Sequence, residues 1–341
     1  QGGKALLSQP QTAIPAMREA TSTLFSEKNF YTIYDKLTKS KKHTLRVKSG
    51  LEILDIDGEF EAHQEAINSP LAEKIPWVRA SNRHMITGLN VLRAGMFDKF
   101  VQKNPDLSQA EYSAYAKFVN EYTGRGSLGF LEKSSHGLTN FLLAPRWVTS
   151  NWQTVVSERN AWVKGEDGKK TLKPKVLKAI VAEKAKFYTA WSALASAFAA
   201  IGWEVGDDPE DSDFMKFRKG DLVIDLTAGS AQTYRLIFLA AETALATRGM
   251  NELEHDADLT NVLKNYASYK FAPSVTVPLE LTTGKNIIGQ ERAFLETVAS
   301  MTTPIIIESA YHDIKEDADW GDINAAMALE AFGVGSQIYE Q

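Results

Sequence analysis

Apolar side chains recur at three- and four-residue steps along much of the chain, and this spacing constrains the fold more than any other feature. Between residues 80 and 101 the spacing is followed by Met85, Leu89, Leu92, Met96 and Phe100. Such a period places apolar residues on one face of an α-helix, which must pack against other elements. The sequence therefore predicts a body of packed amphipathic helices.

The next predicted helix has a recognisable start. Ser108 stands three residues before Glu111, the capping-box pattern in which each residue's side chain accepts a hydrogen bond from the other's backbone N–H. Gly124 is expected to end this helix. Its apolar face is formed by Tyr112, Tyr115, Phe118, Val119 and Tyr122.

The remaining helices and strands are predicted from the spacing of apolar residues and from prolines and glycines that interrupt helices. Pro10 and Pro15 are expected to break the start of the chain, and a helix over 16–37 is expected to be interrupted near Phe30. Alternating residues around Lys219-Gly220-Asp221 predict a β-hairpin over about 215–226. Because no βαβ rhythm is visible, the predicted fold class is mainly α, an irregular multi-helix domain with one small β-hairpin. Further helices are expected over 174–201, 231–247, 291–301 and 303–315.

The domain organisation is predicted coarsely. We expect an N-terminal helical region over 1–105 and a C-terminal helical region with the hairpin over 106–341, or one continuous domain. The sequence begins Gln1-Gly2-Gly3, without Met and without the apolar core of a signal peptide. This start indicates a processed or truncated part of a longer polypeptide.

Composition narrows the function classes. Hydrophobic residues make up 44% and charged residues 24% of the 341 residues, an ordinary globular composition. The absence of cysteine excludes disulfides, thiolate zinc sites, iron–sulfur clusters and a cysteine nucleophile. A net charge of −5 argues against a surface devoted as a whole to nucleic acid.

Gly124, Gly126 and Gly129 spell the GxGxxG pattern of dinucleotide sites. In such sites the glycines follow a strand and open a helix, where backbone amides meet a pyrophosphate. Here a predicted helix precedes them. We interpret the three glycines as a structural turn that follows a helix end.

No catalytic, metal-binding or cofactor-binding residue is predicted. The six histidines are scattered, and neither HExxH nor GxSxG occurs. The acidic run 207–213 lacks the glycine and final glutamate of a calcium loop, so a solvated acidic loop is favoured. Thr283-Gly284-Lys285-Asn286 lacks the other residues of a phosphate loop. A pair of catalytic carboxylates stays open as an alternative because acidic residues are abundant.

Two further segments have functional interpretations. Aromatic and basic residues that could contact a protein or nucleic acid are Arg146, Trp147, Trp152 and Trp162, our candidate interaction surface. The segment Phe187–Trp203 carries no charge but is rich in alanine. A buried core helix is favoured there over contact with a membrane.

Several short strings follow one another in a recognisable order along the chain. They are Thr123–Gly129, Ala144–Trp147, Asp208-Pro209 with Ser212–Phe214, Ile224–Gly229, Lys270–Ser274, Thr283–Lys285 with Ile288-Gly289, and Phe332–Gln337. In this order they resemble the C-terminal region of the large polyvalent proteins of tailed phages. Upstream, Ile75-Pro76, Val78–Ser81 and Arg83 are also similar, so the resemblance covers most of the chain from about Pro15 onward.

The resemblance implies a non-enzymatic module of a virion-internal or ejected phage protein. Such a module would act in particle assembly or in delivery of protein and DNA into the host. Its expected partners are other virion proteins or sister chains, with phage DNA as a further candidate. The expected location is the virion, in the capsid interior or portal region, and the host cell after ejection. The alternatives are a cryptic enzyme of DNA or cell-wall metabolism and a DNA-binding module that uses the Trp/Arg residues.

Overall fold

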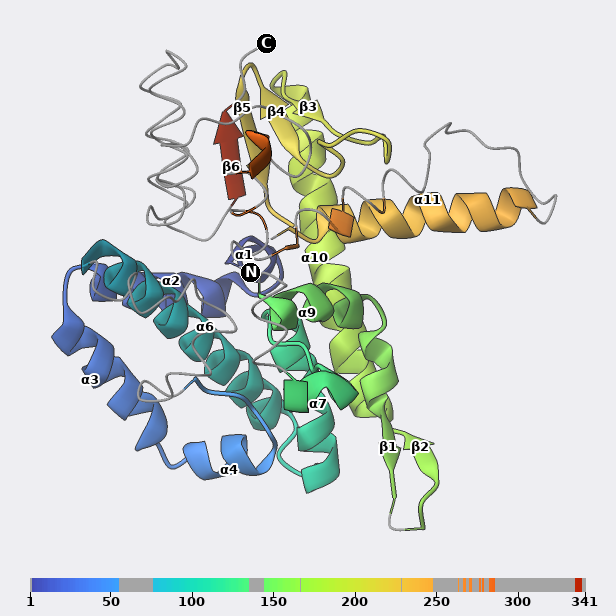
Figure 1. Ribbon diagram of the computed structural model, residues 1–341. Coiled ribbons are helices and arrows are strands. Elements are labelled where there is room, and N and C mark those ends of the chain that lie inside the picture. The colour runs from blue at the N-terminus through green and yellow to red at the C-terminus, as the bar shows by residue number, and fades with distance from the viewer. Residues whose placement is uncertain are drawn as a thin grey trace. The chain divides into compact units, whose positions relative to one another are not determined.

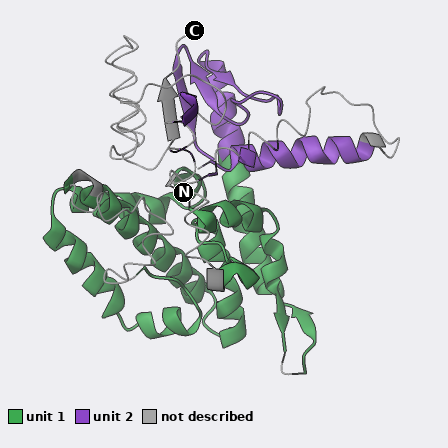
Figure 2. Ribbon diagram, in the orientation of Figure 1, with its two compact units in different colours: residues 1–135, 144–190 green, residues 136–143, 191–341 purple. Residues whose placement is uncertain are grey.

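The computed structural model describes residues 2–54, 76–134, 144–165, 167–227 and 229–247, single residues between 263 and 285, and 335–338. Over these residues the fold is mainly α, an irregular multi-helix arrangement with a small β-hairpin, which confirms the predicted class (Figure 1). The chain divides into two compact units (Figure 2). Unit 1 comprises residues 1–135 and 144–190, and unit 2 comprises 136–143 and 191–341.

Unit 1 is built from helices and one short β-ribbon. Its elements in chain order are α1 (Gly2–Ser8), α2 (Pro10–Leu24), α3 (Glu27–Thr38), α4 (His43–Lys48), α6 (Pro76–Lys103), α7 (Gln109–Tyr122), the 3₁₀ helix η2 (Gly129–Ser134), α9 (Pro145–Val155), the 3₁₀ helix η3 (Ser157–Ala161), β1 (Trp162–Lys164), β2 (Lys170–Leu172) and the first part of α10 (Pro174–Ala200).

The predicted break at Pro10 is present, because α1 ends at Ser8 and α2 begins at Pro10, whereas the predicted break at Pro15 is wrong. Pro10 occupies the first turn of α2, where a missing N–H costs nothing, and Pro15 is accommodated inside the helix. The interruption predicted near Phe30 comes earlier, because Ser26 caps α3 by accepting a hydrogen bond from the Asn29 N–H. Helix α2 approaches α6 closely, and a Cβ on Gly95 would lie 2.4 Å from the Thr12 methyl carbon.

The core of unit 1 lies between α6 and α7. The capping box at Ser108 and Glu111 is present, as predicted. Phe100 of α6 stacks on Tyr115 of α7 with ring centroids 3.7 Å apart. The aromatic face of α7 packs against α6 in this core. The predicted domain boundary near residue 105, between these two helices, therefore lies inside unit 1. The two compact units divide within α10.

Unit 2 contains the second part of α10, a small sheet and helix α11 (Ala231–Thr247). The predicted hairpin is present as β4 (Phe217–Lys219) and β5 (Leu222–Asp225), with Gly220 at φ +57° in its turn. Antiparallel pairing adds β3 (Glu204–Val205) on one side and β6 (Gly335–Ile338) on the other. These added strands and the β1–β2 ribbon are absent from the sequence prediction, since they are short and do not alternate clearly.

The uncharged segment that begins at Phe187 differs from the predicted buried helix. Phe187 is buried, but the following residues of α10 are half-buried or exposed. Trp191 and Phe198 contact the Phe217 ring, at centroid distances of 5.7 and 5.0 Å. Among the helices described, none combines the length and apolarity that a membrane span requires. The helices predicted over 291–301 and 303–315 lie outside the described residues.

Candidate functional site

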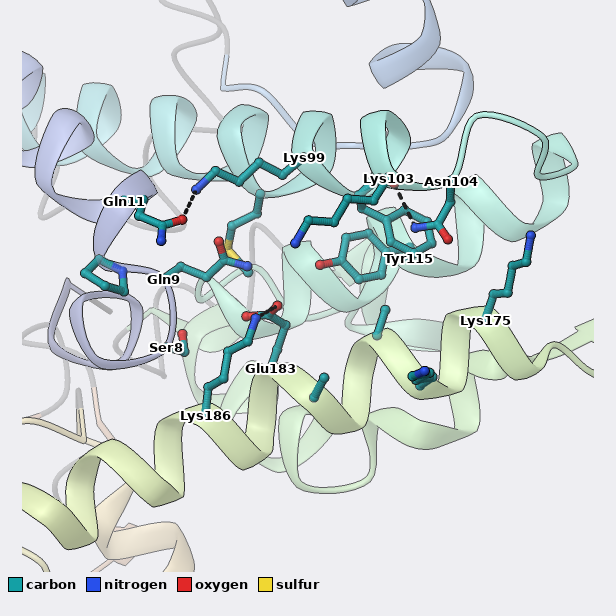
Figure 3. A pocket seen from close by; sticks show the side chains of 16 residues that line it. Ser8, Gln9, Gln11, Lys99, Lys103, Asn104, Tyr115, Lys175, Glu183 and Lys186 are labelled. Atoms are coloured by element: carbon teal, nitrogen blue, oxygen red, sulfur yellow. Dashed lines mark hydrogen bonds and ion pairs between the residues drawn. The ribbon is translucent and has the colours of Figure 1, made fainter.

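A groove in unit 1 gathers five lysines along two helices. It lies between α6 and α10, borders the α1–α2 junction, and has a cavity volume of about 600 Å³ (Figure 3). Figure 3 shows Lys99 and Lys103 extending from α6, with Glu183 and Lys186 on α10. We call this feature, with Lys99, Lys103, Lys175, Lys178 and Lys186, the lysine groove.

Helical spacing places these lysines on facing sides. Lys99 and Lys103 are four residues apart and therefore share one face of α6. On α10 the lysines at 175, 178 and 186 follow the same periodicity and span about 16 Å at 1.5 Å per residue. The small side chains of Ala179 and Ala182 lie between them and leave room above the helix.

The floor of the groove is aromatic. Phe100 and Tyr115 stack on each other and expose only 4% and 2% of their surface. Their faces are therefore not available to stack on a ligand ring. Burial, and then the negative charge of Glu183, raise the pKa of the Tyr115 phenol, so it stays protonated and can donate a hydrogen bond. Its oxygen points into the space between the two helices (Figure 3).

The groove is electropositive although the whole chain is acidic. Five lysines and one glutamate line it, so positive charges exceed negative charges by four. The pKa of Lys99 is lowered by partial burial first and then by the nearby charge of Lys103, while the charge of Glu183 opposes the shift and that of Lys186 adds weakly to it. Its ammonium donates a hydrogen bond to Gln11 Oε1 at 3.4 Å. A bound anion would relieve this repulsion among the lysines.

Glu183 is the carboxylate of the groove. It is 6% exposed, and its Oε1 accepts a hydrogen bond from Lys186 Nζ at 2.8 Å. Its buried Oε2 accepts no hydrogen bond from any residue that the structure describes. This is an unusual state for a buried polar atom, because nearly all such atoms are satisfied.

The residues of the predicted interaction surface lie elsewhere in unit 1, on α9 and β1. Arg146 points inward to Glu132, with a nitrogen–oxygen distance of 2.6 Å, and to the Gly126 carbonyl, so it supports the fold. Trp147 is half-buried. Trp152 and Trp162 are 37% and 53% exposed. None of the four lines the lysine groove.

The three glycines form a loop that docks on α9. Gly124 and Gly129 have φ values of +95° and +59°, which favour glycine. The Gly126 N–H donates to the Arg146 carbonyl at 3.0 Å, and a Cβ at Gly126 would lie 2.4 Å from the Ser150 backbone nitrogen. Segments 123–129 and 144–147 therefore meet in space.

The acidic run in unit 2 is folded around arginines. Asp213 is buried and accepts hydrogen bonds from Arg218, at 2.8 and 2.5 Å. Arg235 donates to the carbonyls of Pro209 and Glu210. Within the described ranges, no three acidic or histidine side chains are grouped so that they could hold a metal ion.

The lysine groove is not among the sites predicted from the sequence. Its signal is the helical spacing of lysines at 99 and 103 and at 175, 178 and 186. Each pattern alone is typical of a solvated helix face. Only the packing that brings α6 and α10 to opposite sides of one cavity makes them a site. Comparison of the chain with family models, curated proteins and solved structures gives no match.

Proposed function

We propose that this chain is a non-enzymatic module of a virion-internal or ejected phage protein that holds single-stranded nucleic acid by its phosphates in the lysine groove. The observation that carries the proposal is the array of five lysines around one cavity in a chain of net charge −5. Lysine ammonium groups bind phosphate oxygens as point charges and release condensed counterions. The phage context rests on the sequence resemblance and supplies a role in delivering DNA to the host or in particle assembly.

The dimensions favour a single strand over a duplex. The cavity of about 600 Å³ lies between two helices, and Lys99 and Tyr115 line its interior. A duplex could reach only the exposed lysines at the rim, such as Lys103 and Lys178. A single strand can enter and contact both the rim and the interior.

The groove is suited to holding a backbone more than to reading bases. Proteins that bind single strands commonly stack bases on exposed aromatic rings. The two rings in this groove are buried against each other. Phosphate contacts therefore supply the affinity, with little dependence on sequence.

Two other features bear on the alternatives of a cryptic enzyme and of protein contact through the Trp/Arg residues. Glu183 is the single carboxylate among the residues that line the groove, so this cavity offers no pair of convergent carboxylates for acid–base chemistry. Trp152 and Trp162 are exposed and available for contact with other virion proteins or sister chains.

Fluorescence anisotropy with a labelled single-stranded oligo(dT) of about twelve nucleotides tests the proposal. The double variant Lys103→Gln/Lys178→Gln removes two exposed charges of the groove. We expect it to weaken binding by about tenfold or more at low salt, because each lysine–phosphate contact contributes to affinity.

The matched control is Lys164→Gln/Lys170→Gln, which removes two exposed charges paired across the β1–β2 ribbon. We expect this control, and Trp152→Ala on the predicted interaction surface, to bind like the unmodified chain. Equal losses in the two lysine double variants would mean that binding is a property of total charge, and the proposal would be wrong.

A further inference from the structure

Glu183 stands where a phosphate-binding groove has no use for a negative charge. It projects from the same face of α10 as the lysines, and it is only 6% exposed. Lys186 Nζ, 2.8 Å from Oε1, is its one ion-pair partner among the described residues. A carboxylate in this position repels phosphate, so the groove is not built for phosphate alone.

The second oxygen of Glu183 is an unused acceptor. Oε2 is buried, and no described residue donates a hydrogen bond to it. A buried acceptor without a donor is costly, and the cost is recovered when a donor arrives. Figure 3 places the carboxylate on the groove side of α10, between Lys186 and the α1–α2 junction.

The ion pair with Lys186 can be exchanged. The Lys186 side chain is 50% exposed, so its ammonium can rotate from Glu183 toward a phosphate in the groove. That rotation takes from Glu183 the one ion-pair partner that it has among the described residues. A ligand with a hydrogen-bond donor beside its phosphate would replace the hydrogen bond that Lys186 no longer donates to Glu183.

We infer that Glu183 accepts a hydrogen bond from an amino or hydroxyl group of the bound nucleotide, and so makes the lysine groove selective among single strands. This inference rests on the proposed function. Two groups have the required chemistry, namely the exocyclic amine of a base, such as N4 of cytosine, and the ribose 2′-hydroxyl. Thymidine has neither group, and its one base donor, N3–H, lies between O2 and O4, two acceptors that the carboxylate repels.

Three labelled homopolymers of equal length separate these sources. Oligo(dT) has neither donor, oligo(dC) has the base amine, and oligo(rU) has the 2′-hydroxyl. We expect the unmodified chain to bind oligo(dC) or oligo(rU) about tenfold more tightly than oligo(dT), the range of one hydrogen bond to a charged group. The member that is preferred identifies the donor.

Glu183→Gln tests whether this residue makes the choice. The amide lacks the negative charge and its NH2 group can donate to thymine O4, so we expect binding of oligo(dT) to strengthen and the ratio between homopolymers to fall toward one. Glu158→Gln is the matched control, because Glu158 also pairs with an α10 lysine, Lys184, at 2.6 Å, but does not line the groove. It should leave the ratio unchanged.

The outcomes separate this inference from the proposed function. If all three homopolymers bind equally, or if the preference survives in Glu183→Gln, the role of Glu183 is overturned while the phosphate groove stands. If the unmodified chain binds none of the three, the proposed function fails and this inference fails with it. Circular dichroism of each variant confirms that the helices are intact.

Discussion

Glu121 and Glu183 are both buried in unit 1, but the chain completes the hydrogen bonding of only one of them. Glu121 accepts a hydrogen bond from Asn160 at Oε2, 2.7 Å away, and from Arg159 at Oε1, 3.4 Å away. Glu183 has Lys186 at one oxygen and no described donor at the other. The environment of Glu121 therefore serves the fold, whereas Glu183 keeps one acceptor oxygen without a described donor, as our inference of a nucleotide donor requires.

Their surroundings agree with this distinction. Glu121 lies on the core helix α7, and its backbone carbonyl also accepts a hydrogen bond from Thr154 of α9. It therefore links α7 to the segment that follows α9. Glu183 borders the lysine groove, where four of the five lysines are exposed.

The largest effect is expected from Glu121→Gln. An amide has one acceptor oxygen where the carboxylate has two, so its NH2 group must face either the buried Asn160 amide or the half-exposed Arg159 guanidinium, at a cost of about 2 kcal/mol of unfolding free energy. Urea denaturation followed by circular dichroism measures this cost. A loss below about 0.5 kcal/mol would show that these bonds do not support the fold.

Replacing Glu183 by glutamine should change the unfolding free energy much less than replacing Glu121. Glu183→Gln removes a buried charge whose Oε2 has no described donor, so we expect the unfolding free energy to stay within about 0.5 kcal/mol or to rise. The measurement is again urea denaturation, without nucleic acid. A destabilisation as large as that of Glu121→Gln would contradict the comparison.

The smallest effect is expected in the pH dependence of stability. Burial raises the pKa of Glu121, although Asn160 and Arg159 oppose the shift. A carboxyl whose pKa is higher in the folded state binds more protons folded than unfolded, so its contribution falls as the pH rises through the window above the ordinary glutamate pKa. The unfolding free energy of the unmodified chain, taken relative to that of Glu121→Gln at each pH, should therefore decline slightly between about pH 4 and pH 7. If the unfolding free energies of the unmodified chain and of Glu121→Gln changed with pH at the same rate, the raised pKa of Glu121 would be contradicted.

The helical body could be predicted because it depends on local signals. The capping box at Ser108 and the periodicity of residues 80–101 are properties of neighbouring residues. The hairpin around Gly220 is local in the same sense. Pairing of β5 with β6 joins residues more than a hundred positions apart, and nothing in either strand's sequence indicates the other.

The candidate site depends on packing that no local pattern contains. Aromatic and basic residues that are close in sequence predict an interaction surface at the Trp/Arg residues, yet Arg146 forms an ion pair with Glu132 inside unit 1. The lysines of the groove belong to α6 and α10, which are separated by α7 and α9 along the chain. That Glu183 Oε2 has no described hydrogen-bond donor can be recognised only from the positions of the residues around it.

The central claim is that the lysine groove holds nucleic-acid phosphates, and the salt dependence of oligo(dT) binding tests it most directly. If about four or five lysines displace counterions, the slope of log K against log salt should be about −3 for a single strand. Lys103→Gln/Lys178→Gln should reduce its magnitude by about 1.4, whereas Lys164→Gln/Lys170→Gln should leave it unchanged. A slope near zero, or the same slope in all three proteins, would contradict the account.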